Sequence, residues 1–125
     1  MQLKKDDLEK AREVKTFLEK NYQEHYDYDY LIKKFAINRF KLKLAFKAVA
    51  NDNVHVYITK VRIEKAKHLL DHTTYTVSLI AVKVGLDKSN FNLQFKKLTG
   101  YTPAKWRKRP FGNRGTYTQD VGDRA

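Results

Sequence analysis

VGLDKSNFNLQFKKLTGYTP, residues 84–103, combines a strongly apolar helix face with a strongly polar one. Phe91 and Phe95 stand four residues apart, a spacing that puts both rings on the same side of an α-helix. Asp87 is a residue type that caps helix N-termini, and Gly100 is the type that most readily ends a helix in the left-handed conformation. The stretch therefore predicts a helix that buries its Phe side and exposes its Asn, Gln and Lys side.

The same apolar frame occurs earlier in the chain, at an offset of 49 residues. It is found by placing residues 27–57 above residues 76–106. The matched pairs include Leu31 over Ile80, Phe35 over Val84, Ala36 over Gly85, Ile37 over Leu86, Leu42 over Phe91, Phe46 over Phe95, Asn51 over Gly100 and Tyr57 over Trp106. Self-similarity at a fixed period indicates one structural unit that is used twice.

Each copy is predicted to contain a short helix, a tight turn at Ala36 or Gly85, and a second helix capped by Asn38 or Asp87. In the second copy Thr102-Pro103 starts a further helix. Two helices joined by a tight turn with a small residue form the helix-turn-helix pattern, whose second helix enters the major groove of DNA.

The rest of the chain completes an all-α prediction with about seven helices. Apolar residues at helical spacing indicate an N-terminal amphipathic helix and a long helix between the two copies. We expect two helix-turn-helix subdomains joined by this linker helix. The expected segments are an N-terminal helix packed on the first subdomain (1–26), the first subdomain (27–53), the linker helix (54–72), the second subdomain (73–109) and a flexible tail (110–125).

The charge distribution predicts a polyanionic partner for the later part of the chain. The formal net charge is +12, with 26 Lys and Arg against 14 Asp and Glu. Residues 1–28 carry a net charge of −1 and residues 29–125 carry +13. This excess favours nucleic acid first and an acidic membrane surface second. The chain has no Cys and no apolar run of membrane-spanning length, so we expect a cytoplasmic, nucleoid-associated protein without a membrane segment.

The sequence resembles the AraC/XylS-type regulators over about residues 10–109. The stretches TVSLIAVKVGL and FNLQFKKLTGYTPAKWRK look like the C-terminal signature of that family, and YITKVRIEKAKHLL is similar to its linker helix. Ile32, Asn51 and Leu86 depart from the usual residue types. The resemblance implies a bacterial transcription regulator that reads two successive major-groove segments, roughly 34 Å apart on one side of the DNA. It also implies a stand-alone protein or a DNA-binding domain cut from a longer one.

The resemblance assigns DNA contacts to residues of both recognition helices and of the helix that follows Thr102-Pro103. Base contacts are expected from Arg39, Phe40, Lys43, Leu44, Lys88, Ser89, Asn90 and Leu93. Lys and Arg suit guanine, Asn suits adenine, and Phe or Leu can contact a thymine methyl group. Phosphate contacts are expected from Lys41, Lys47, Lys96, Lys97, Lys105, Arg107 and Lys108. Arg62 matches the linker arginine of the family, for which a structural role is expected.

Other interpretations remain open at this point. The lysines alone would also suit a solvated face, and Arg107–Arg109 would suit a solvated helix end favoured by the helix dipole. A non-specific RNA- or nucleoid-binding helical protein is the alternative function.

Glu64, His68 and His72 are expected to be surface residues, and we expect no enzyme, metal or cofactor. RNA polymerase is a further candidate partner, and binding as a monomer is expected unless the chain is part of a longer protein. The operator, the inducer and the sign of regulation cannot be derived from the sequence.

Overall fold

The computed structural model describes residues 2–110, and within that range the chain forms seven α-helices and no strand. The expected all-α fold is therefore confirmed. The helices are α1 (Lys5–Lys20), α2 (Tyr28–Phe35), α3 (Arg39–Ala50), α4 (Val54–His72), α5 (Val77–Lys83), α6 (Lys88–Thr99) and α7 (Pro103–Lys108). The tail expected from residue 110 onward lies outside the described residues except for Pro110.

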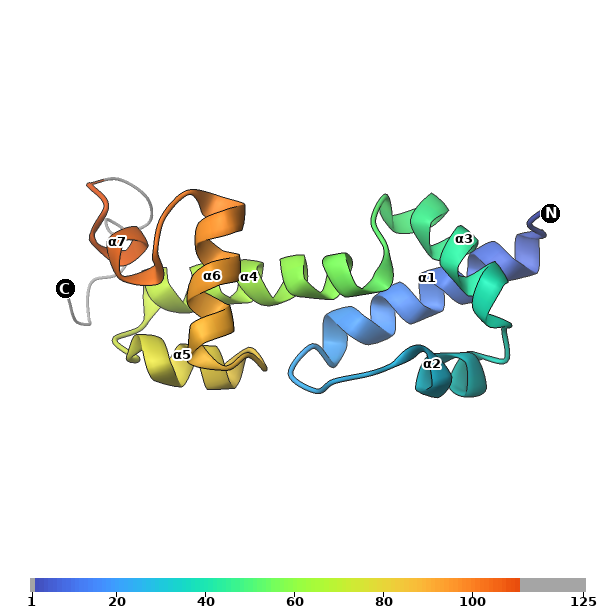
Figure 1. Cartoon of the computed structure of the whole chain (residues 1–125), viewed down its shortest axis with the longest axis horizontal. Coiled ribbons are helices and arrows are strands. Elements are labelled where there is room, and N and C mark those ends of the chain that lie inside the picture. Colours follow the sequence, from blue (N-terminus) through green and yellow to red (C-terminus); the bar gives the residue numbers. More distant parts are fainter. Residues whose placement is uncertain (1, 111–125) are drawn as a thin grey trace. The chain divides into compact units, whose positions relative to one another are not determined.

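The chain divides into two compact units between Val61 and Arg62. The first unit contains α1, α2, α3 and the first part of α4. The second unit contains the remainder of α4 together with α5, α6 and α7. Figure 1 shows α2 and α3 against α1 in the first unit, and α6 beside α5 in the second.

The core of the first unit forms where the apolar side of α1 meets the helix-turn-helix pair. Ala11, Val14 and Leu18 of α1 are fully buried. Val14 and Leu18 pack with apolar residues from α2, α3, α4 and the turn, namely Leu31, Ile37, Leu42, Phe46, Val54 and Ile58. Burying a Leu or Phe side chain stabilises a fold by about 1.5–3 kcal/mol, so this shared core holds α3 in place.

The core of the second unit is built around the two aromatic rings of α6. Phe91 and Phe95 are both fully buried and meet edge to face at 5.6 Å between ring centroids. Further buried side chains come from α4, α5 and the turn, namely Ile63, Ala66, Leu70, Ile80, Ala81, Val84 and Leu86. Val84 is the C-cap of α5 rather than a residue within that helix.

Both recognition helices begin with the predicted side-chain caps. The Asn38 Oδ1 atom accepts the backbone N–H of Lys41 at 2.8 Å, and the Asp87 Oδ1 atom accepts that of Asn90 at 2.8 Å. A cap of this kind satisfies one of the four N–H groups that the first turn of a helix leaves unpaired. The two helices therefore begin at the equivalent positions that the repeat predicts.

The helix ends and the turns also follow the repeat, and one turn places an alanine in the left-handed region of backbone conformation. Asn51 and Gly100 close α3 and α6 in the left-handed region, with φ of 65° and 84°. The turn of the second unit has Gly85 at φ 87°, whereas the turn of the first unit has Ala36 at φ 54°. The left-handed region costs an L-residue roughly 1–2 kcal/mol, and glycine avoids that cost.

We expect the substitution Ala36→Gly to raise the free energy of unfolding by about 1 kcal/mol. Ala36 is exposed, so removing its Cβ gives up no core contact. Urea titration followed by circular dichroism measures the change. Gly100→Ala is the reverse control, because a Cβ there meets nothing within 4 Å and only the backbone strain should appear. An unchanged or lower stability of Ala36→Gly would contradict the strain at this turn.

Candidate nucleic-acid interface

Helix α3 has a buried apolar side and an exposed side that carries both basic and apolar residues. Leu42, Ala45 and Phe46 are fully buried. Arg39, Phe40, Lys43 and Leu44, all expected to contact bases, are exposed. Phe40 is 55% exposed and Leu44 39% exposed, so both apolar side chains are accessible to a partner.

Helix α6 presents a less charged outer side. Lys88, Ser89, Asn90 and Leu93 are exposed, with Leu93 at 64%. The Gln94 side-chain amide donates to Asn90 Oδ1 at 3.4 Å, which is long for a hydrogen bond and leaves Asn90 able to change partners. The first recognition helix thus offers two cations and two apolar groups, whereas the second offers one cation, one apolar group, one hydroxyl and one amide.

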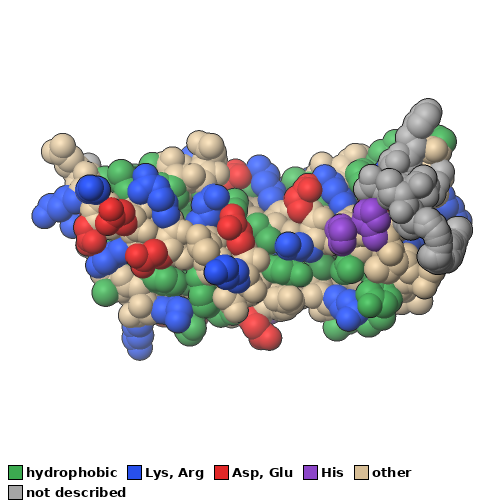
Figure 2. All heavy atoms as spheres, turned by 180° about the vertical axis from the view of Figure 1, so that it is seen from behind, with side chains coloured by type: hydrophobic (Ala, Val, Ile, Leu, Met, Phe, Trp, Pro, Cys, Tyr) green, Lys and Arg blue, Asp and Glu red, His purple; other side chains and the backbone are tan. Residues whose placement is uncertain are grey.

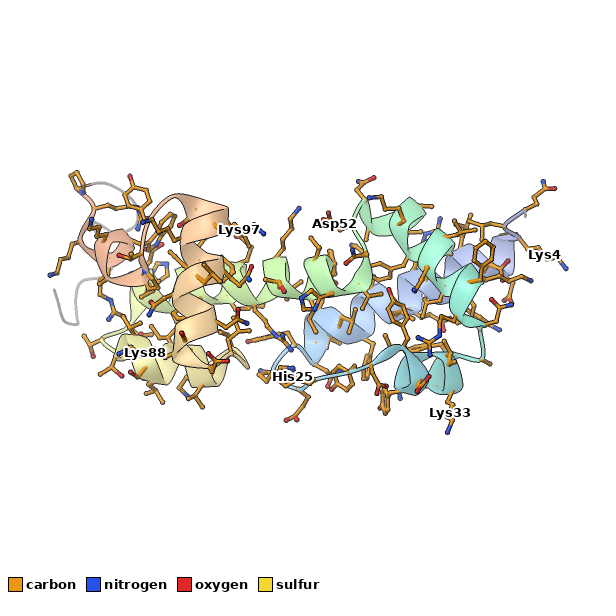
Figure 3. All side chains as sticks on the ribbon, in the orientation of Figure 1. Lys4, His25, Lys33, Asp52, Lys88 and Lys97 are labelled. Atoms are coloured by element: carbon orange, nitrogen blue, oxygen red, sulfur yellow. The ribbon has the colours of Figure 1, made fainter. Side chains whose placement is uncertain are left out.

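Most of the lysines expected to contact phosphates are exposed. Five of them, Lys47, Lys96, Lys97, Lys105 and Lys108, lie on the surface, and Lys41 is half-buried in the first turn of α3. Figure 3 labels Lys88 and Lys97 near the two ends of α6. On the face drawn in Figure 2, the first unit carries Asp and Glu side chains among its Lys and Arg side chains.

Arg107, which is expected to contact a phosphate, also donates to backbone carbonyls of the second unit. Its guanidinium group donates to three backbone carbonyls at the end of α4 and beyond, those of Leu70 (3.1 Å), Thr73 (3.1 Å) and Tyr75 (2.6 Å). The last carbonyls of a helix have no partner within the helix, and a basic side chain can satisfy them. These contacts hold α7 against the end of α4 and would compete with the phosphate contact that is expected of Arg107.

Arg109 is also not part of a solvated helix end. Its guanidinium lies 3.7 Å from the centre of the Trp106 ring and donates to Asp71 Oδ1 at 3.0 Å. Trp106 donates its ring N–H to the same Asp71 oxygen at 3.1 Å and packs edge to face on Phe95 of α6. Asp71 is only 4% exposed. This network of Asp71, Trp106 and Arg109 connects α4 and α7 with the buried side of α6.

The first unit contains a comparable aromatic anchor. Tyr57 packs edge to face on Phe46 with ring centroids 5.6 Å apart, the same separation as that between Trp106 and Phe95. The Tyr57 hydroxyl donates to the Glu19 carboxylate of α1. Burial and this bond to Glu19 raise the pKa of Tyr57 well above its ordinary value, so the phenol stays protonated and remains a donor.

Arg62, His68 and His72 lie on α4. Arg62 is 3% exposed, a burial that favours a structural role and leaves little surface for DNA. His68 and His72 lie one turn apart on α4 with ring centroids separated by 4.5 Å. Within residues 2–110 no group of three or more His, Cys, Asp or Glu side chains is arranged to hold a metal ion. No helix in that range has the length and hydrophobicity to cross a membrane.

Comparison with protein-family models matches residues 31–109 to a family described as a helix-turn-helix domain. The matched range runs from the core residue Leu31 to the Arg109 that stacks on Trp106, and so includes both helix-turn-helix pairs. The chain belongs to the AraC-type helix-turn-helix family. This is a family of transcription-regulator DNA-binding domains and not an enzyme family.

Curated relatives and solved structures of the AraC type agree with this assignment. The chain is 37% identical over 67 residues to the HTH-type transcriptional activator RhaR of Salmonella heidelberg, and the match covers 53% of this chain and 24% of that protein. It is 30% identical to the C-terminal domain of the response regulator yesN from Fusobacterium nucleatum, with a TM-score of 0.71 and coverage of 78% and 97%. The match to RhaR shows that the chain spans about a quarter of the length of the curated relatives it matches.

Two further solved structures share the fold at lower identity. The C-terminal domain of AraT from Geobacillus stearothermophilus gives a TM-score of 0.77 at 22% identity, covering 90% of this chain and 94% of that one. The DNA-binding domain of AdpA, solved in complex with a target DNA, gives 0.74 at 21% identity, covering 82% and 97%.

Proposed function

We propose that this chain is a sequence-specific, double-stranded DNA-binding transcription regulator that reads two adjacent major-groove segments with α3 and α6. The observation that carries the proposal is the composition of these two helices. Each is capped at equivalent positions and buries an aromatic side. Each also exposes side chains that suit base edges. The AdpA domain, which shares this fold, was solved with a target DNA.

We assign the base contacts to the exposed outer sides of the two helices. On α3 these are Arg39, Phe40, Lys43 and Leu44, and on α6 they are Lys88, Ser89, Asn90 and Leu93. Arg and Lys donate to the O6 and N7 atoms of guanine, Asn pairs with the N6 and N7 atoms of adenine, and Phe or Leu meets a thymine methyl group. Because the two helices differ in chemistry, the two segments should differ in sequence, and the whole site should be asymmetric.

We assign the phosphate contacts to lysines only. They are Lys41, Lys47, Lys96, Lys97, Lys105 and Lys108, because Arg107 is engaged by backbone carbonyls. These contacts supply affinity and position the helices, while the base contacts supply the preference among sequences. We further propose that one copy binds without a cofactor, that RNA polymerase is a second partner, and that the chain acts at the nucleoid without catalysing a reaction.

Salt dependence and competition test this proposal together. We expect the logarithm of the binding constant for a selected duplex to fall with the logarithm of salt concentration at a slope of about −5, from about 0.9 per lysine–phosphate contact. Between about 50 and 200 mM salt the affinity should drop roughly a thousandfold. Fluorescence anisotropy with a labelled duplex measures the slope.

The competing interpretation is a non-specific nucleic-acid-binding protein, and the same titrations separate the two. A regulator should prefer its selected duplex over a scrambled duplex by at least about a thousandfold at physiological salt. Equal affinity for both duplexes would favour the non-specific function. A slope near zero would contradict DNA binding through these lysines altogether.

A further inference from the structure

Two base-facing cations of α3 share one aromatic ring. The Tyr28 ring lies 5.6 Å from the Arg39 guanidinium carbon and 5.1 Å from the Lys43 ammonium nitrogen. Both separations fall within the range in which a cation is attracted to a ring face. Arg39 and Lys43 are four residues apart on α3 and therefore project from the same side of the helix.

The ring of Tyr28 is itself held in place. Tyr28 is the first residue of α2, and its N-cap Asp27 accepts the backbone N–H of Tyr30 at 2.9 Å. The side chain is half-buried and packs against the core of the first unit, to which α1, α2, α3 and α4 contribute. Packing against this core therefore limits the positions that the ring can take.

The phenol is neutral in this setting, so the two cations meet the face of an uncharged ring. Burial raises the pKa of Tyr28 above its ordinary value, while the Val54 N–H and the Arg39 charge oppose that rise to a smaller extent. The neighbouring residue Asp29 accepts a hydrogen bond from Arg39 Nη2. Because both members of that ion pair are exposed, it constrains the guanidinium more than it stabilises the fold.

We propose that Tyr28 is a positioning residue that orders Arg39 and Lys43 for base reading before DNA binds. The inference rests on the proposed function. Long cationic side chains lose rotamer entropy when they are fixed on a partner, so order that is present beforehand lowers the cost of binding. The Tyr28 ring supplies that order while leaving the ends of both cations at the surface.

The repeat restricts the effect to one unit. At the offset of 49 residues, Val77 stands at the position of Tyr28 and Ser78 at that of Asp29. Val77 is likewise the first residue of its helix, α5, so the two positions correspond in structure as well. Valine has no aromatic ring to attract a cation, and serine carries no charge to pair with one. The proposal therefore predicts that loss of the ring affects reading by α3 alone.

The test compares wild type, Tyr28→Leu, Tyr28→Phe and Val77→Leu on a duplex selected by the wild-type chain. We expect Tyr28→Leu to weaken binding roughly fivefold to thirtyfold, from the loss of two cation–ring contacts. Its preference among base substitutions should fall in one half-site only, the half-site affected by Lys43→Ala. Tyr28→Phe keeps the ring and should retain most of both properties, and Val77→Leu should leave that half-site unchanged.

A measurement without DNA gives a second, independent readout. Ring currents from Tyr28 should shift the side-chain methylene protons of Lys43 upfield in NMR spectra of the wild type and of Tyr28→Phe, and the shift should vanish in Tyr28→Leu. Thermal unfolding is recorded for each variant.

The outcomes separate this inference from the proposed function. If Tyr28→Leu keeps the Lys43 shifts and the wild-type base preference, the inference is overturned while the proposed function stands. If Tyr28→Leu lowers the melting temperature and weakens both half-sites equally, Tyr28 is only a structural residue and the inference is again overturned. If the wild type binds selected and scrambled duplexes equally, the proposed function fails and the inference fails with it.

Discussion

Phe95→Ala is expected to lower the free energy of unfolding by about 3–5 kcal/mol. The Phe95 ring is fully buried, and it meets Phe91 and Trp106 edge to face at 5.6 Å in each case. Truncation removes these contacts and leaves a cavity at the junction of α6 with α7. Urea titration followed by circular dichroism measures the loss.

Leu98→Ala is the matched control on the same helix. Leu98 is 40% exposed, so its truncation should cost less than about 1 kcal/mol. A Phe95→Ala variant as stable as the Leu98→Ala variant would mean that the buried and exposed sides of α6 are reversed. In that case Ser89, Asn90 and Leu93 would not be available to DNA.

Asp71→Ala is the second substitution with a large expected effect, about 2–3 kcal/mol. Asp71 accepts hydrogen bonds from the Trp106 ring and from Arg109, whose side chain is only 13% exposed. Its removal leaves a largely buried guanidinium without its counter-charge and takes the acceptor from the Trp106 N–H. Chemical unfolding measures the loss, and Trp106 fluorescence reports the change around the ring.

Glu64→Ala on the same helix is the control, because it removes an exposed ion pair whereas Asp71→Ala removes a buried one. The Glu64 side chain is 68% exposed in its pair with Lys67, so its loss should change stability by no more than about 0.5 kcal/mol. Asp71→Asn keeps an acceptor for Trp106, so its loss of stability should lie between those of Asp71→Ala and Glu64→Ala. If Asp71→Ala were as mild as Glu64→Ala, the network would not hold α7 in place.

The helices of both units were predictable because their signals are local. The caps Asn38 and Asp87 and the left-handed ends Asn51 and Gly100 each act within one turn of their own residue. The fully buried pair Phe91 and Phe95 follows from a spacing of four residues. Such features depend on backbone geometry that a short stretch of sequence determines.

The interactions around α7 were not predictable because their partners are distant in sequence. Arg107 stands in a basic run, and nothing in that run distinguishes the arginine that binds carbonyls of residues 70, 73 and 75 from its neighbours. Asp71 likewise meets Trp106 and Arg109 across 35 and 38 residues. Only the packed second unit brings these groups together, so the carbonyl contacts of Arg107 and the interactions of Asp71 could not be predicted from the sequence.

The aromatic support of α3 was missed for a similar reason. Tyr28 lies eleven residues before Arg39 in a segment with several tyrosines, and its spacing to Lys43 follows no helical period. The available signal was the repeat itself, because Tyr28 and Val77 are equivalent positions with different side chains. The two copies differ at most paired positions, so this difference alone does not single out Tyr28.

The central claim is that two copies of one helical unit each read a separate segment of one duplex. Selection from a random duplex library, with sequencing of the bound pool, tests it most directly for the wild type, Lys43→Ala and Asn90→Ala. We expect an asymmetric two-part motif with centres roughly one helical turn apart. Lys43→Ala should relax one part and Asn90→Ala the other. One short continuous motif, or loss of the same part in both variants, would contradict the claim.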